Sequence, residues 1–253
     1  MSPTIWTRCA GVSEIRPLSD TFRRVVEAQF RNSTRKLVDS DEEQAALESL
    51  LDERAKLPVP EEFKGLHFLL STPFRHPPLK NGSRFGTRFE RGILYGAREL
   101  PVAFAEVAYY RLLFLEGTTA DLGLLGVELT AFSFGIAAKR AVDLTKPPFA
   151  RYEAEISSKT AYEAPQRLGA GMRDSGVAGC LYVSARAEGR GICVAVFDDV
   201  FKPRKPFGEE RWTCAATKER VEFSSGGLLR KSVRHAYGRG QFLVRGRLPS
   251  PAA

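Results

Sequence analysis

The segment PVAFAEVAYYRLLFL (101–115) constrains the fold more than any other part of this chain. It is apolar nearly all round, with Glu106 and Arg111 as its only charged residues. A helix that is apolar on every side has to be buried. An ionised carboxylate there is costly unless it is paired or hydrogen-bonded. The sequence therefore predicts a buried helix whose glutamate belongs either to a structural Glu–Arg pair or to a functional site.

Short apolar runs beyond residue 65 predict the elements around this helix. Strands are expected at 67–71, 93–95, 124–134, 141–144, 177–183 and 191–197, and a second helix at 162–174. Segment 72–92 is rich in Pro, Gly and Arg and is expected to be a long functional loop. Strands outnumber helices and do not alternate strictly with them, which indicates an α+β fold with a mixed or antiparallel sheet.

The first 60 residues are expected to form a helical extension of the main domain. Apolar residues recur there at helical spacing, at Phe22, Val25, Val26 and Phe30. A second helix fits 39–56, and the prolines at 58 and 60 end it. We therefore divide the chain into a helical extension (1–60), a main domain (61–224) and a tail (225–253).

The net charge of +8 resides mostly in the tail. From residue 225 onward there are six basic residues and no acidic ones: Arg230, Lys231, Arg234, Arg239, Arg245 and Arg247. The rest of the chain is nearly balanced. We expect a poorly ordered terminus. A nucleic-acid-binding module that uses this tail is the non-enzymatic alternative.

Several classes of protein are disfavoured. No apolar run approaches the ~18 residues of a transmembrane helix, and the N-terminus has no apolar stretch typical of a secretory signal. The few Cys and His residues show no metal-ligand spacing, so we expect free thiols, no metal and a cytoplasmic location. No GxGxxG motif suggests reversible dinucleotide binding. The histidines form no evident triad with a serine, which disfavours a serine hydrolase.

Arg84, Tyr95 and Glu106 follow one another at intervals of eleven residues. A guanidinium offers a planar fork of donors to phosphate, and a tyrosine ring stacks on a flat heterocycle. A carboxylate can hold a sugar hydroxyl. Together these groups suit a nucleotide whose glycosidic bond is to be broken, although each has an ordinary structural explanation as an ion pair or a core residue.

The segments PFRHPPLKNGSRFGTRFERGILYGARELPVAFAEVAYYR and GCLYVSARAEGRGICVAVF resemble the RES domain family, and RRVVEAQFRNSTRKLVDSDEEQAALESLLDE is similar to the extension of its longer members. The resemblance implies an ADP-ribosyltransferase-like fold, a split β-core with flanking helices and a cleft for NAD. It implies that NAD is a substrate, that no further cofactor is needed, and that an antitoxin protein blocks the enzyme. His76 stands where some members have tyrosine, so its role stays open.

The resemblance also supplies a role for each candidate residue. Glu106, Ser184 and Arg84 are the expected catalytic set, with Glu106 holding the nicotinamide ribose. Arg75 and Arg84 are expected to bind the pyrophosphate, Tyr95 to stack on nicotinamide, and Ser184 to bond a ribose or an acceptor phosphate. Ser184 could instead simply cap a strand end.

The expected reaction is cleavage of the nicotinamide–ribose bond of NAD, by phosphorolysis or by hydrolysis. Inorganic phosphate is therefore an expected second partner, in a toxin that forms homo- or hetero-oligomers and does not act at a membrane. An ADP-ribosyltransferase that modifies a protein or nucleic acid is the enzymatic alternative. It shares the first bond-breaking step and differs only in the acceptor.

Overall fold

The computed structural model describes residues 3–28, 40, 42–43, 58–76, 80–120, 122–227 and 230–250. The predicted helix 39–56 lies almost wholly outside these residues. Within them the helices are α1 (Ile5–Arg8), α3 (Phe68–Arg75), α4 (Leu100–Glu116), α5 (Glu153–Ile156) and α6 (Glu163–Asp174). Short 3₁₀ turns are η1 (Gly11–Glu14), η3 (Glu61–Phe63), η4 (Phe149–Tyr152), η5 (Glu188–Arg190) and η6 (Arg239–Phe242).

The described strands form one eight-stranded sheet in the order β1-β2-β5-β4-β3-β6-β7-β8. Their bounds are β1 (Arg16–Glu27), β2 (Leu94–Ala97), β3 (Leu125–Asp143), β4 (Gly179–Val183), β5 (Ile192–Val196), β6 (Phe207–Ala216), β7 (Arg220–Gly227) and β8 (Arg230–Gly238). β3 and β4 are parallel and the other neighbours antiparallel. The predicted α+β fold with a mixed sheet is confirmed.

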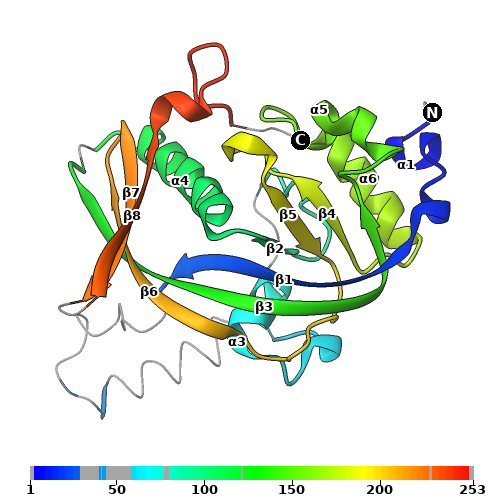
Figure 1. Cartoon of the computed structure of the whole chain (residues 1–253), viewed down its shortest axis with the longest axis horizontal. Coiled ribbons are helices and arrows are strands. Elements are labelled where there is room, and N and C mark those ends of the chain that lie inside the picture. The colour runs from blue at the N-terminus through cyan, green and yellow to red at the C-terminus, as the bar shows by residue number, and fades with distance from the viewer. Residues whose placement is uncertain are drawn as a thin grey trace.

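Helices cover both faces of this sheet, α4 on one and the shorter α3 on the other (Figure 1). One core cluster joins apolar residues of α4, such as Phe104 and Leu112, to Leu129 of β3 and Phe223 of β7. A second cluster lies under α3. α1, α5 and α6 group together beside β4 (Figure 1). The predicted buried helix at 101–115 is therefore confirmed.

The sheet is split where β1 meets β2. β1 pairs with β3 along almost its whole length, whereas its register with β2 holds a single pair, Arg23 with Ala97. Gly96 lies at this junction, and a Cβ there would come within 2.7 Å of the Phe134 ring, so the close approach of the strands requires glycine. Residues of β1, β2 and α4 around this junction line a cavity.

The predicted helix over Phe22–Phe30 is wrong for its described residues, because β1 occupies Arg16–Glu27. Phe22 belongs to the core cluster under α3 and Val25 to the cluster under α4. Since both faces of this strand are covered, the alternation that identifies a strand is obscured and the apolar spacing imitates a helix. The described part of the extension is thus built into the central sheet.

Three further predictions need correction. Residues 67–71 are not a strand: α3 begins at Phe68, and the Nδ1 atom of His67 caps it by accepting from the Leu69 amide at 3.3 Å. The two strands predicted at 124–134 and 141–144 are one strand, β3. Strands β6 and β7 were not predicted at all. Short apolar runs do not distinguish a strand from a helix, which explains the error at α3.

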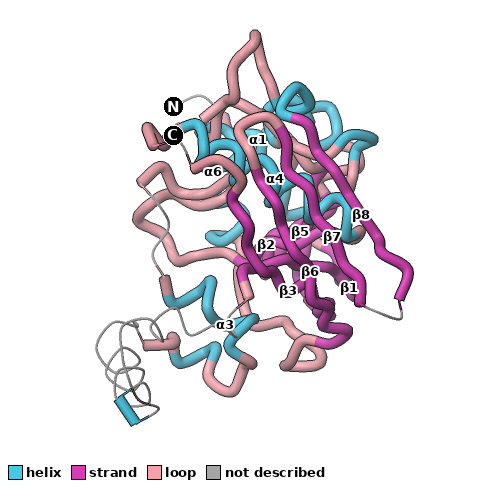
Figure 2. The backbone as a smooth tube through the Cα atoms, turned by 90° about the vertical axis from the view of Figure 1, so that its left-hand side faces the viewer, coloured by secondary structure: helices cyan, strands magenta, loops and turns pink. Residues whose placement is uncertain are grey.

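The predicted disordered tail is also wrong for the residues that the structure describes. β8 pairs with β7, and Figure 2 shows β6, β7 and β8 side by side. The chain then returns over α4, where Tyr237, Phe242 and Leu248 are buried. The segment thus contains apolar residues that reach the core as well as basic ones, and its charge composition alone did not reveal this. The tail is therefore part of the folded body.

Candidate active site

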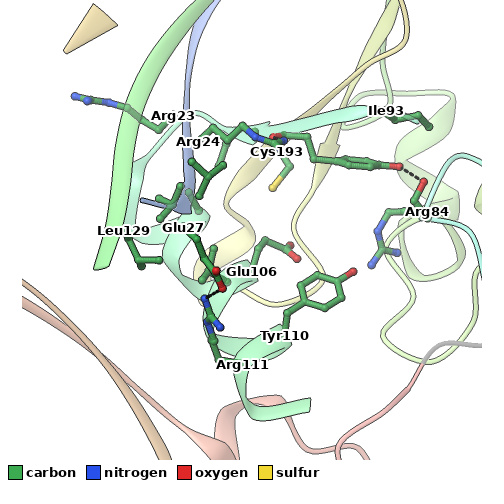
Figure 3. A pocket seen from close by; sticks show the side chains of 18 of the residues that line it. Arg23, Arg24, Glu27, Arg84, Ile93, Glu106, Tyr110, Arg111, Leu129 and Cys193 are labelled. Carbon is green, nitrogen blue, oxygen red and sulfur yellow. Dashed lines mark hydrogen bonds and ion pairs between the residues drawn. The ribbon is translucent and has the colours of Figure 1, made fainter. Parts of the chain in front are cut away.

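A cavity of about 650 Å³ lies between α4, the split strands and the loop before β2. α4 lines it with one stripe of residues spaced three or four apart: Ala103, Glu106, Val107, Tyr110, Arg111 and Phe114. Arg84 and Tyr95 line it as well. In Figure 3 the Glu106 carboxylate lies between Arg84 on one side and the Glu27–Arg111 ion pair on the other. The three residues spaced by eleven therefore do meet in one cavity.

Glu106 is held by a hydroxyl group and not by a cation. The Ser184 hydroxyl donates to Oε1 of Glu106 at 2.6 Å. Among the residues that the structure describes, no cationic side chain lies within 4.0 Å of this carboxylate. Glu106 thus has no arginine partner among the described residues, and the half-buried carboxylate lines the cavity, where a ligand can reach it.

Ser184 follows β4 and is buried. Its Oγ atom accepts hydrogen bonds from the backbone amides of Arg186 and Ala187, at 3.1 and 3.0 Å, while it donates to Glu106. A hydroxyl group with both acceptor sites and its proton engaged is a positioning group and is not poised as a nucleophile. His67, His76 and His235 all lie outside the cavity lining.

Arg84 is buried at the opposite side of the cavity from the Glu27–Arg111 pair. Its Nη1 donates to the carbonyls of Ile156 and Ser158 at 3.1 and 2.9 Å, and no carboxylate of the described chain comes within 4.0 Å of it. Burial lowers the pKa of this guanidinium, but the surrounding tyrosines and Glu106 raise it, so the pKa is raised overall and the group stays charged. Arg84 is therefore a fixed cation without a carboxylate partner.

Tyr95 projects from β2 into the cavity, and its hydroxyl group is held by two hydrogen bonds. The hydroxyl donates to Oγ of Ser83 at 2.9 Å and accepts from the Phe85 amide at 3.1 Å. Burial raises the pKa of Tyr95, so the phenol is neutral. The ring meets that of Tyr182 edge to face at 6.4 Å. Two tyrosine rings thus form a rigid wall beside Arg84.

The comparisons agree with the motifs from which this site is built. A family model described as the RES domain matches residues 59–217, more than half of the chain. The chain belongs to the RES domain family. A similar solved structure is the M. tuberculosis MbcT–MbcA toxin–antitoxin complex, with 12% identity, a TM-score of 0.44, and coverage of 76% of this chain and 80% of that chain. No curated protein matches the sequence.

Arg24 contributes to the cavity from outside the matched RES domain, and sequence reasoning missed it. It lies on β1, and its Nη1 donates to the Tyr95 carbonyl at 2.6 Å across the split. Its Nε is buried without a hydrogen-bond partner among the described residues. Burial lowers its pKa to about 10, which marks a cation short of counter-charge. The helix predicted for this segment concealed Arg24, because this arginine reaches the cavity only as a residue of β1.

Arg75 and His76, which the sequence analysis also singled out, lie outside the cavity lining. Arg75 lies in the last turn of α3 and does not line the cavity. His76 follows it, exposed. Arg186, two residues after Ser184, is buried outside the cavity lining, with its guanidinium 3.5 Å from the centre of the Tyr109 ring and a hydrogen bond to the Lys159 carbonyl at 3.1 Å. The RES domain structure thus unites Arg84, Tyr95, Glu106 and Ser184 and leaves Arg75 apart.

Cysteine and metal chemistry find no support in the described residues. All four cysteines are buried free thiols, and burial raises the pKa of Cys180 and Cys193. In the ranges given above, no group of three or more His, Cys, Asp or Glu side chains could hold a metal ion. None of the helices in those ranges has the length and apolar character needed to cross a membrane.

Proposed function

We propose that this RES domain protein cleaves the nicotinamide–ribose bond of NAD and transfers the ADP-ribosyl group to inorganic phosphate. The bond between ribose C1′ and the nicotinamide nitrogen breaks, and its electron pair leaves with neutral nicotinamide. A phosphate oxygen forms the new bond to C1′. The observation that carries this proposal is the Glu106 carboxylate, fixed by Ser184 in the cavity with no cation of the described chain within 4.0 Å of it.

Glu106 is suited to the transition state of this reaction. Its Oε1 is tied to Ser184, so Oε2 is the atom that can accept a hydrogen bond from a ribose hydroxyl. Positive charge develops on the ribose ring as nicotinamide departs, and a carboxylate fixed in advance stabilises that charge without having to reorient. Hydrogen bonds to the 2-hydroxyl strengthen in such oxocarbenium-like states. Ser184 acts here as a positioning residue.

Phosphorolysis requires two anionic groups to be bound near one ribose. The cavity offers two guanidinium groups that have no carboxylate within 4.0 Å among the described residues, Arg24 and Arg84. A guanidinium group binds phosphate oxygens through paired donors. One group therefore serves the pyrophosphate of NAD and the other the acceptor phosphate. Simple hydrolysis would need only one of them.

The test is nicotinamide release from NAD by the purified protein, with and without phosphate. We expect a rate that rises and saturates with phosphate, and a phosphorylated ADP-ribose product. Glu106→Ala should lower the rate about a hundredfold or more, and Glu106→Gln, which keeps the size but removes the charge, should also be severely impaired. Glu99→Gln is the matched control, because Glu99 precedes the same helix, is exposed and lies outside the cavity.

Three results would overturn parts of the proposal. A phosphate-independent rate that yields only ADP-ribose would make the protein a hydrolase. Label transferred from NAD to a protein or nucleic acid would make it an ADP-ribosyltransferase. Full activity in a folded Glu106→Ala variant would remove Glu106 from the chemistry altogether.

The proposed cellular role is that of a toxin that depletes NAD, controlled by an antitoxin protein. Membership of the RES domain family supports this role. Expression of the wild-type chain should lower cellular NAD and stop growth, whereas Glu106→Ala should do neither. Growth arrest that persists with Glu106→Ala would separate toxicity from the proposed reaction.

A further inference from the structure

We propose that the cavity binds NAD in one direction, with adenine in the apolar end between α4, β1 and β3 and nicotinamide at the tyrosine wall. This inference rests on the proposed function and adds to it a nucleobase subsite. The two ends of the cavity differ in chemistry, and Glu106 lies between them (Figure 3).

The apolar end is lined by aliphatic and aromatic side chains. Val107 and Phe114 come from α4, Val25 from β1 and Leu129 from β3. Val25 and Leu129 are buried and belong to the same core cluster, so they form a fixed floor. Phe114 is 56% exposed and stands at the rim. A neutral, flat heterocycle fits such a slot between aliphatic side chains and a free aromatic ring.

The charges beside this apolar end are balanced. Arg111 lines it in an ion pair with Glu27, and Arg23 lines it from β1 and pairs with Glu210 at 3.6 Å. The nicotinamide ring of NAD carries a positive charge, whereas adenine is neutral. An apolar slot whose neighbouring carboxylates are already paired disfavours the cationic ring and permits adenine.

The other end suits the cationic ring. Tyr95 and Tyr182 present ring surfaces there, and Tyr110 and Tyr162 lie close by with their hydroxyl groups 3.3 Å apart. The faces of aromatic rings attract cations. The Arg84 guanidinium already lies over the rings of Tyr162 and Tyr182, 5.2 and 5.9 Å from their centres, which leaves Tyr95 for the nicotinamide ring. Arg84 also lies at this end, and a phosphate bound to it would offset its charge beside the nicotinamide ring.

This direction of NAD also decides which phosphate each of the two guanidinium groups, Arg24 and Arg84, binds. Adenine in the apolar end and the ribose at Glu106 bring the pyrophosphate to the split between β1 and β2, where Arg24 lies. Arg84 is then left for the acceptor phosphate. The assignment differs from the one that the sequence favoured, in which Arg84 binds the pyrophosphate.

The test compares two substrates that share the reacting bond. NAD carries the adenosine half and nicotinamide mononucleotide lacks it. Phe114→Ala should raise the KM for NAD roughly threefold to tenfold, as expected for the loss of one aromatic contact. It should leave kcat for NAD and the kcat/KM for nicotinamide mononucleotide unchanged. Phe89→Ala is the matched control, since Phe89 is 83% exposed and lies outside the cavity.

A second measurement keeps the test decisive if the mononucleotide is a poor substrate. Adenosine monophosphate should compete with NAD, and Phe114→Ala should raise its inhibition constant by about the same factor as the KM for NAD. An equal loss with both substrates, or unchanged inhibition by adenosine monophosphate, would overturn the proposed direction. Failure of the wild-type chain to release nicotinamide from either substrate would instead overturn the proposed function.

Discussion

The surface of α4 serves two purposes. The part that does not line the cavity, its packed face, is buried: Phe104 stacks on Phe223 at 4.3 Å and meets Trp212 edge to face at 4.8 Å. Tyr109, which also lies outside the cavity lining, is buried, and its hydroxyl donates to the Pro249 carbonyl. On the cavity face, Glu106 has one hydroxyl partner and no cation of the described chain within 4.0 Å. Stability and chemistry are thus assigned to different side chains of one helix, and substitutions should separate them.

The largest expected effect comes from the packed face. Phe104→Ala removes a fully buried ring between two aromatic neighbours and should lower the free energy of unfolding by about 3–5 kcal/mol. Phe114→Ala, one residue of the same type on the cavity face, should stay within about 0.5 kcal/mol of wild type. Urea denaturation measures both. Equal losses from the two variants would contradict the division of α4 into a stabilising and a ligand-binding face.

The next effect concerns the positioning of Glu106. Ser184→Ala removes the donor to Glu106 and the acceptor of two amides, so kcat should fall about tenfold to a hundredfold, as for a lost transition-state contact, with little change in KM. The two amides left unpaired should also cost about 1–3 kcal/mol of stability.

The conservative variant shows which of these losses matters for the reaction. Ser184→Thr keeps the hydroxyl group and should recover most of kcat. If Ser184→Ala loses stability but keeps its kcat, the serine only caps the strand end.

A smaller effect is expected from Tyr109→Phe, which removes one hydrogen bond behind the active site. It should cost about 1 kcal/mol at neutral pH and leave nicotinamide release nearly unchanged. Calorimetry and the nicotinamide assay measure the two quantities. Loss of activity without loss of stability would show that the packed face also tunes the site.

The same tyrosine predicts how stability depends on pH. Burial raises the pKa of Tyr109 from 10.0 to about 12 in the folded chain. Because the folded pKa lies above the unfolded value, this contribution is complete below pH 10 and is lost as the pH rises toward 12. The melting temperature of Tyr109→Phe should therefore fall less steeply than that of wild type across this range. Parallel curves would contradict the role of Tyr109.

The sequence revealed α4 and the residues of its cavity face better than it revealed the sheet. The apolar run at 101–115 has the length and composition of a buried helix, so its assignment needed no tertiary information. The intervals of eleven between Arg84, Tyr95 and Glu106 come from one continuous segment, in which a short strand and one helix suffice to bring them together. Local patterns are reliable where a site is built mostly from neighbouring elements.

The missed features all depend on partners far away in the sequence. β1 is a strand because it pairs with β3 more than 100 residues later, and Arg24 reaches the cavity only through that pairing. β8 is ordered because Tyr237 and the residues after it pack against α4, as in the bond from the Tyr237 hydroxyl to the Pro101 carbonyl at 2.7 Å. Propensity and charge composition carry no information on such contacts.

The smallest expected effect distinguishes Arg75 from Arg84, the two arginines that the sequence analysis assigned to the pyrophosphate. Arg84→Lys loses the planar fork of donors and the bonds to the Ile156 and Ser158 carbonyls, so both ligand binding and the melting temperature should fall. Arg75→Ala should change the kinetic constants less than about twofold, the ordinary range of a surface site. It should cost about 0.3–1 kcal/mol of stability, the usual contribution of a cation in the last turn of a helix.

Titration of NAD and phosphate against the two variants decides between the arginines, because Arg84 lines the cavity and Arg75 does not. Binding that weakens as much in Arg75→Ala as in Arg84→Lys would mean that an anion of the substrate or the acceptor lies near the end of α3. The bound anion would then extend beyond the cavity described above, and the assignment of Arg84 to the acceptor phosphate would be wrong.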